Sequence, residues 1–160
     1  MIGLLPFNIK DVEVIEIAVE KLLLLVPKKF MNGIFLSDWK IEQFKDYPFL
    51  MVGKNNRFRD KVDEYLYENN TIPNILIESE NIETLLDLCI EEMGITFYNS
   101  LFIKQKLHSL RSIYEEKISI LDLNDIRTDM VAIGYYKHRY LTFAAKEFIR
   151  IAKERFSNTL

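Results

Sequence analysis

Two hydrophobic patterns follow one another near the start of the chain. From Asp11 to Glu20 apolar residues are interleaved with acidic ones, and from Leu22 to Pro27 every residue is apolar. Alternation is typical of a strand with one buried face, and a short unbroken apolar run is typical of a strand buried on both faces. We therefore expect two strands, the second ended by Pro27, and then a turn at Asn32-Gly33 in a polar connection.

Between residues 47 and 99, short apolar runs alternate with amphipathic segments. The apolar runs predict strands at residues 49–52, 74–77 and 95–99. The segments between them, at about 57–69 and 80–94, have the apolar spacing of one helical face. These apolar residues are Phe58, Val62, Tyr65 and Leu66 in the first helix and Ile82, Leu85, Leu86, Cys89 and Met93 in the second. This order of elements predicts parallel strands joined by right-handed crossovers.

Polar and small residues mark the ends of these helices. Asn55 or Asn56 is expected to cap the first helix, because an asparagine side chain can accept from the exposed N–H groups there. Gly94 is expected just past the end of the second helix, where a left-handed backbone favours glycine. Cys89 falls on the apolar face, and we expect it in the core.

The last third of the chain predicts further strands and helices. A candidate helix lies near residues 100–108, and candidate strands lie near 117–121 and 130–136. The segment from Leu141 to Phe156 predicts a terminal helix capped by Thr142. Its expected buried face consists of Ala145, Phe148, Ile149, Ala152 and Phe156.

Composition points to one globular domain in a reducing compartment. The 160 residues are 49% hydrophobic, enough for a sizeable core, and carry a net charge of −3. Because a duplex-binding protein usually presents a basic face, this charge argues against nucleic-acid binding by these residues. A single cysteine excludes an internal disulfide. The chain shows no secretory signal, and its longest apolar run is too short to span a membrane, so we expect a cytoplasmic protein.

Short polar side chains gather where three predicted strands end. The segments are Lys54-Asn55-Asn56-Arg57, Glu78-Ser79-Glu80-Asn81 and Tyr98-Asn99-Ser100. If the strands are parallel neighbours, these ends meet at one edge, where open α/β sheets bind ligands and helix N-termini favour anions. The residues expected to bind a ligand there are Asn55, Asn56, Arg57, Glu78, Ser79, Asn81, Tyr98, Asn99 and Ser100.

Local roles are the alternative for the same residues. Asn and Ser are common at helix starts purely as caps. Arg57 has two interpretations: it binds an anionic ligand, or it pairs with Asp60 or Glu80. Catalytic chemistry is not indicated, since the chain has no glycine-rich phosphate loop and no G-x-S-x-G turn, and His108 and His138 lack metal-ligand spacing. We expect no enzyme, no cofactor and no metal.

Four segments, in order, resemble one known family. They read EKLLLLVPKKF, YPFLMVGKNNRFRDKVDEYLYENNTIPNILIES, ETLLDLCIEEMGITFYNSLF and HRYLTFAAKEFIRIAKE. In order and spacing they resemble the effector-binding domain of LysR-type transcriptional regulators. The resemblance departs in two places: Glu92-Met93-Gly94-Ile95 lacks the first glycine of the family's Gly-x-Gly-Ile, and Asn99 stands where proline is frequent.

The resemblance implies a fold and a function. The fold would be α/β, a Rossmann-like, periplasmic-binding-protein-like subdomain with a mostly parallel sheet flanked by helices. The chain would be the sensor part of a regulator that binds a small metabolite as its effector, forms a homodimer, and reaches DNA only through a helix-turn-helix domain absent from this chain; the Arg57 interpretation above leaves open whether that effector is anionic. The alternative is a free-standing small-molecule-binding or interaction protein derived from such a domain.

The resemblance also implies a division of the chain. Residues 1–21 would be a remnant of the first effector subdomain with a hinge strand, residues 22–132 the second subdomain, and residues 133–160 the hinge return and a C-terminal helix packed on that remnant. We expect a truncated or naturally shortened chain, with exposed apolar surface on segments 1–20 and 140–157. That surface predicts a homodimer of non-standard geometry.

Overall fold

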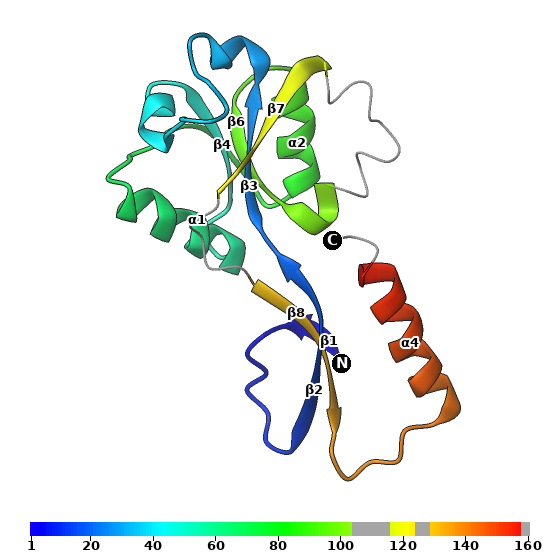
Figure 1. The fold of residues 1–160 in the computed structure, drawn as a ribbon. Coiled ribbons are helices and arrows are strands. Elements are labelled where there is room, and N and C mark those ends of the chain that lie inside the picture. The colour runs from blue at the N-terminus through cyan, green and yellow to red at the C-terminus, as the bar shows by residue number, and fades with distance from the viewer. Residues whose placement is uncertain (104–115, 124–128, 158–160) are drawn as a thin grey trace. The chain divides into compact units, whose positions relative to one another are not determined.

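The computed structural model describes residues 1–103, 116–123 and 129–157. The chain divides into two compact units, Leu22–Ile126 and Met1–Lys21 with Arg127–Leu160 (Figure 1). Each unit has its own sheet. None of the described helices is both long enough and apolar enough to cross a membrane.

The unit Leu22–Ile126 is built on a five-stranded sheet. Its strands are β3 (Leu22–Pro27), β4 (Pro48–Val52), β5 (Asn74–Ser79), β6 (Ile95–Asn99) and β7 (Ile118–Asp122). They lie in the order β5-β4-β6-β3-β7. β4 is parallel to both β5 and β6, whereas β3 is antiparallel to β6 and β7, so all strands but β3 run the same way. The predicted parallel strands of this α/β unit are confirmed.

Helices cover both faces of this sheet. On β3, Leu24 points into one buried cluster and Leu25 into the other, as alternation along a strand requires. Helix α1 (Arg57–Glu68) closes the first cluster with Val62 and Leu66, and helix α2 (Ile82–Ile90) closes the second with Leu85, Leu86 and Cys89 (Figure 1). The short 3₁₀ helices η1 (Lys28–Met31) and η2 (Ile41–Phe44) follow β3, and Ile41 and Phe44 of η2 also enter the first cluster.

The start of α1 agrees with the prediction from the sequence, but the end of α2 does not. Asn56 caps α1, because its Oδ1 accepts from the Phe58 N–H at 2.9 Å. The prediction for the end of α2 is wrong: the left-handed residue is Glu92, with φ of 59°, and Met93 is exposed beyond the helix. Gly94 serves a different purpose, since a Cβ there would lie 2.8 Å from the Pro48 carbonyl oxygen.

The second unit contains a three-stranded antiparallel sheet in the order β1-β8-β2. Its strands are β1 (Ile2–Leu4), β2 (Val12–Glu20) and β8 (Asp129–Tyr136). The sequence pattern did not predict β1. In β2 the pairing register shifts between Glu16 and Ala18, which interrupts its alternation.

Helix α4 (Phe143–Ser157) packs against β2 within this unit. As predicted, the Thr142 hydroxyl caps it and accepts from the Ala145 N–H at 3.2 Å. Ala152 is buried on the packed face, but the prediction for Phe148 is wrong, since 55% of it is exposed. The candidate helix near residues 100–108 is helical as far as residue 103, and residues 104–108 lie outside the described part.

Candidate functional site

The carboxyl ends of β4, β5 and β6 lie at one edge of the larger sheet. β4 is the middle strand of the three and is parallel to both neighbours. The register places Val52, the last residue of β4, opposite Ser79, the last residue of β5. The Gly53 N–H donates to the Ser79 carbonyl oxygen at 3.2 Å just beyond this pair. The predicted convergence of the three strand ends is therefore confirmed.

Two of the expected ligand residues are helix caps. Asn56 holds the first turn of α1, and Asn81 accepts from the Glu83 N–H at 3.0 Å at the start of α2. The Ser79 hydroxyl supports the second cap, because it accepts from the Asn81 N–H at 3.1 Å. These contacts orient the N-terminal ends of both helices at the strand edge. Their binding role remains a prediction.

The other expected residues differ in exposure. Asn55 and Arg57 are exposed at the end of β4, and both interpretations of Arg57 remain predictions. After β6, Asn99 is half-buried, Ser100 is buried, and Tyr98 is fully buried in the cluster covered by α2. The accessible polar groups of the edge therefore lie mainly after β4 and β5.

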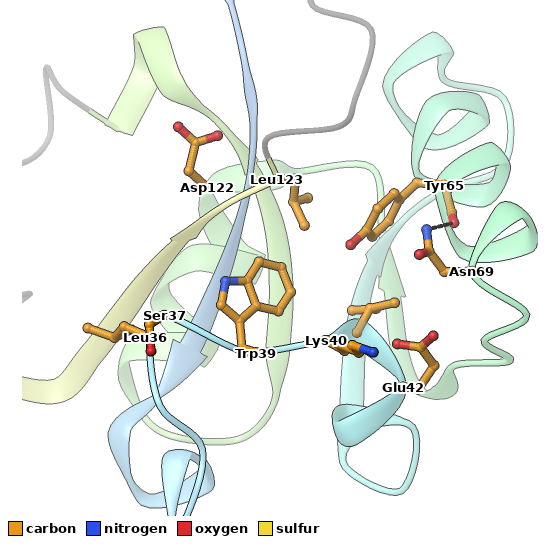
Figure 2. Close-up of a pocket in the computed structure, with 10 residues that line it drawn as sticks. Leu36, Ser37, Trp39, Lys40, Glu42, Tyr65, Asn69, Asp122 and Leu123 are labelled. Atoms are coloured by element: carbon orange, nitrogen blue, oxygen red, sulfur yellow. Dashed lines mark hydrogen bonds between the residues drawn. The ribbon is translucent and has the colours of Figure 1, made fainter.

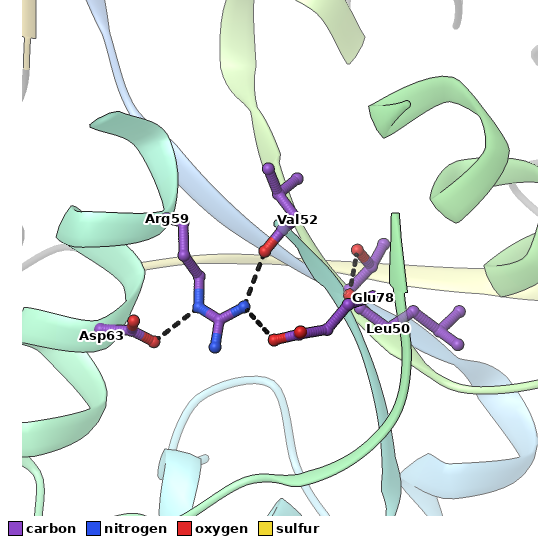
Figure 3. A network of polar contacts seen from close by, with 6 residues as sticks. Leu50, Val52, Arg59, Asp63 and Glu78 are labelled. Carbon is purple, nitrogen blue, oxygen red and sulfur yellow. Dashed lines mark hydrogen bonds and ion pairs between the residues drawn. The ribbon is translucent and has the colours of Figure 1, made fainter. Parts of the chain in front are cut away.

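A buried arginine connects these strand ends, and the sequence analysis did not identify it. The Arg59 side chain is 4% exposed. Its Nη1 donates to the Val52 carbonyl oxygen and to Glu78 Oε1, both at 2.7 Å, and its Nε donates to Asp63 at 2.8 Å (Figure 3). Glu78, expected to bind a ligand, thus forms an ion pair with Arg59.

The helical spacing of the sequence could have placed this arginine on the buried face of the helix. Arg59 lies three residues before Val62 and seven before Leu66, both of which are buried. It also lies four residues before Asp63, the distance at which opposite charges meet along a helix. Arg57 attracted attention because it follows the strand directly, whereas Arg59 occupies the inward face.

Charge at this junction is balanced within the protein. Burial lowers the pKa of Arg59, but its bonds to Asp63 and Glu78 raise it by more, so the net shift is upward. The hydrogen bond from Arg59 holds the pKa of Glu78 below its ordinary value, and the nearby Arg59 and Lys54 charges act in the same direction. Arg59 and its two carboxylate partners therefore stay charged and paired, and this pairing fixes the strand ends.

The edge offers hydrogen-bonding and electrostatic recognition. It combines two helix N-termini with exposed amide and cationic side chains, a set that can bind a polar or anionic small molecule. In the described part of the chain, no three His, Cys, Asp or Glu residues are grouped as metal ligands. Cys89 is buried, which raises the pKa of its thiol to about 12.

Many solved structures share the fold of this chain. The effector binding domain of QuiR in complex with shikimate has a TM-score of 0.63 at 19% identity, over 98% of this chain and 71% of that one. The CcmR regulatory domain of Synechocystis PCC6803 in complex with 2-PG has a TM-score of 0.69 at 16% identity, over 98% of this chain and 73% of that one. HinK, a LysR family transcriptional regulator from Pseudomonas aeruginosa, has a TM-score of 0.66 at 14% identity, over 97% of this chain but 52% of that one.

Sequence comparison supplies the family. No curated protein matches the chain significantly. The family model of the LysR substrate binding domain, however, matches residues 1–157, almost the whole length. The mixed α/β fold with mostly parallel strands agrees with this match. The chain therefore belongs to the LysR substrate binding domain family.

Proposed function

We propose that this chain is the effector-binding sensor part of a LysR-type transcriptional regulator, and that its effector binds at the carboxyl edge of β4, β5 and β6. The observation that carries the proposal is the parallel arrangement β5-β4-β6, which brings three strand ends to one edge. Ligands of open α/β sheets bind at such edges. Two proteins of the same fold were solved with small molecules, shikimate in QuiR and 2-PG in CcmR. We infer that this chain is not an enzyme.

The chemistry of the edge favours an anionic effector. The N-termini of α1 and α2 carry a partial positive charge, which favours a negatively charged group nearby. Lys54 and Arg57 are exposed beside the start of α1. Asn55 adds an exposed amide next to them. A carboxylate or phosphate group would be stabilised by all of these groups together.

Thermal shift measurements across small anions, including shikimate, test the proposal. A compound that binds only the folded chain raises Tm. The shift should be lost or strongly reduced in Arg57→Gln and in Asn55→Ala. Lys45→Gln is the matched control, because Lys45 is an exposed cation three residues before β4 begins, at the other end of that strand. A ligand-induced shift that both edge variants retain in full would contradict the proposed position.

We further propose that the chain forms a homodimer through apolar surface of the smaller unit. The predicted exposure is present: Ile2 and Val14, and then Phe143, Phe148 and Ile151, are 45–82% exposed. Exposed apolar side chains that form a continuous patch are typical of contact surfaces, and we propose that these side chains form one. Light scattering of Phe148→Glu should give a monomer, whereas Lys153→Gln on the same helix should behave as the unmodified chain. A monomer for the unmodified chain at high concentration would refute this proposal.

In the whole regulator, effector binding would bias the geometry of the dimer, and other residues would contact DNA. The net charge of −3 supports this division of labour, since phosphate contacts need clustered cations. A gel shift with the isolated chain should therefore show no binding to duplex DNA. Retardation that disappears as salt is raised would show instead that these residues bind DNA.

A further inference from the structure

A pocket of about 440 Å³ lies within the larger unit, and none of the nine residues expected at the strand edge lines it. Three segments far apart in sequence form its walls: residues 36–42, the C-terminal half of α1 with Asn69, and the end of β7 (Figure 2). A volume of this size is within the range of small-molecule sites in proteins, about 300–1,000 Å³.

The wall formed by residues 36–42 is held in place by its own contacts. The Lys40 N–H donates to Gln43 Oε1 at 2.7 Å, and the Gln43 N–H donates back to the Lys40 carbonyl oxygen at 3.1 Å. Next to them Ile41 and Phe44 are buried in the core. Trp39 packs against the same core, with its ring centroid 6.2 Å from that of Phe44. These contacts fix the position of this wall.

The lining carries both charges and an apolar surface. Lys40 and Glu42 lie on one wall, and neither side chain forms an ion pair with any other described residue. Opposite them is Asn69, whose amide is fixed by its 2.8 Å bond to the Tyr65 carbonyl oxygen (Figure 2). To one side of these groups, the partly buried Trp39 supplies apolar contact area, whereas Leu123 beside it is buried.

These groups select for a ligand with charges of both signs. A simple anion would contact Lys40 but meet the carboxylate of Glu42, which also lines the pocket. A simple cation would contact Glu42 but meet the Lys40 ammonium. Hydrogen bonds to charged groups are stronger than those between neutral groups. A ligand with both a carboxylate and an ammonium group can form one such bond with Lys40 and one with Glu42. An apolar group beside Trp39 adds burial.

We propose that this pocket is a second small-molecule site, separate from the strand edge, and that it binds an α-amino acid with an apolar or aromatic side chain. The carboxylate of the amino acid pairs with Lys40, its ammonium group pairs with Glu42, and its side chain packs on Trp39. The site is independent of the effector proposed above, because the two share no lining residue.

The chain reports on this site by itself, since Trp39 is its single tryptophan. Titration with L-phenylalanine, L-leucine and L-methionine should change the tryptophan emission saturably for at least one of them below about 10 mM. 3-Phenylpropionate lacks the ammonium group and 2-phenylethylamine lacks the carboxylate. Each should bind at least about tenfold more weakly than L-phenylalanine, because one charged hydrogen bond is lost.

Variants separate this site from non-specific binding and from the strand edge. Lys40→Gln and Glu42→Gln should each weaken binding about tenfold, whereas Lys45→Gln and Arg57→Gln should leave it unchanged. Both pocket side chains are exposed, so neither change threatens the fold. Circular dichroism checks that each variant retains the fold. Absence of a saturable response to all three amino acids, or equal losses in Lys40→Gln and Lys45→Gln, would overturn the proposal.

Discussion

The guanidinium group of Arg59 donates to the main-chain carbonyl oxygen of Val52 at 2.7 Å, and this bond ties helix α1 to the end of β4. The same nitrogen reaches Glu78 on β5, so one side chain joins three elements. A buried carbonyl oxygen without a donor would cost free energy, and here the arginine supplies that donor. The edge proposed to bind the effector thus depends on a residue that lies beneath it.

Replacing Arg59 by methionine should lower the free energy of unfolding by about 1–3 kcal/mol. The reason is the loss of the donor to the buried Val52 carbonyl, since Asp63 and Glu78 are partly exposed and can be hydrated. Urea denaturation measures the change. Arg57→Met is the matched control, because Arg57 is exposed two residues earlier, and it should cost less than about 0.5 kcal/mol. Equal losses would contradict the assigned role.

Stability should depend on the ionisation of Glu78. Its pKa is depressed in the folded state, so its contribution is present above the ordinary value of 4.5 and is lost as pH falls through the folded value. The difference in Tm between the unmodified chain and Glu78→Gln should therefore shrink as the solution is acidified below that value. In the Arg59→Met background this pH-dependent difference should vanish. Its persistence there would mean that Arg59 is not the cause.

Gly94→Ala should destabilise the larger unit by about 1–3 kcal/mol. The new methyl group would lie 2.8 Å from the Pro48 carbonyl oxygen and from Leu50 Cγ, and the first of these belongs to the backbone. Gly33→Asn is a suitable comparison, because Gly33 has φ of 76° and open space around it, and asparagine tolerates that conformation. Chemical denaturation should show a clear loss only for the variant at Gly94.

Leu24→Ala should cost about 2–5 kcal/mol, because it opens a cavity in a fully buried cluster between the sheet and α1. Leu36→Ala, at a side chain that is 65% exposed, should change the unfolding free energy by less than about 0.5 kcal/mol. Denaturation midpoints of the two variants measure the contrast. Similar midpoints would show that β3 is not the centre of the core.

The Cys89 thiol should be unreactive in the folded protein. It is fully buried and donates to the Leu25 carbonyl oxygen at 3.5 Å, and burial raises its pKa to about 12. A disulfide reagent at pH 8 should label it only after addition of urea. Because the folded pKa is raised, this thiol should also weaken the fold as pH rises from its ordinary value of 9.0 towards 12. Rapid labelling of the native protein would refute this placement.

Local pattern was sufficient for most of the architecture. The unbroken apolar run from Leu22 to Pro27 predicted a strand covered on both faces, and the structure has it between β6 and β7. The spacing of Val62 and Leu66 specified a helix with one buried side. The pattern was misleading at Phe148, an apolar residue at helical spacing that is exposed. Only packing decides how far round a helix the buried face extends.

The site depends more than the fold on contacts between residues that are distant in sequence. Arg57 and Arg59 are two residues apart on the same helix, and the sequence drew attention to the one that is exposed. Which of them turns inward depends on the rotation of α1 against β4 and β5. The pocket beside Trp39 could not be predicted from local pattern. Residues 36–42 have the pattern of a connecting segment, and only the fold brings them next to α1 and the end of β7.

The sequence by itself determined most of the strands and helices, and it predicted that three strands run in parallel with their polar ends at one edge. Those properties follow from hydrophobic period and connection length, which act over a few residues. Only the tertiary structure decided that Arg59 bonds to Val52 and Glu78, and that Lys40, Asn69 and Leu123 line one pocket. Contacts between residues distant in sequence depend on how whole elements pack, and no local period encodes that.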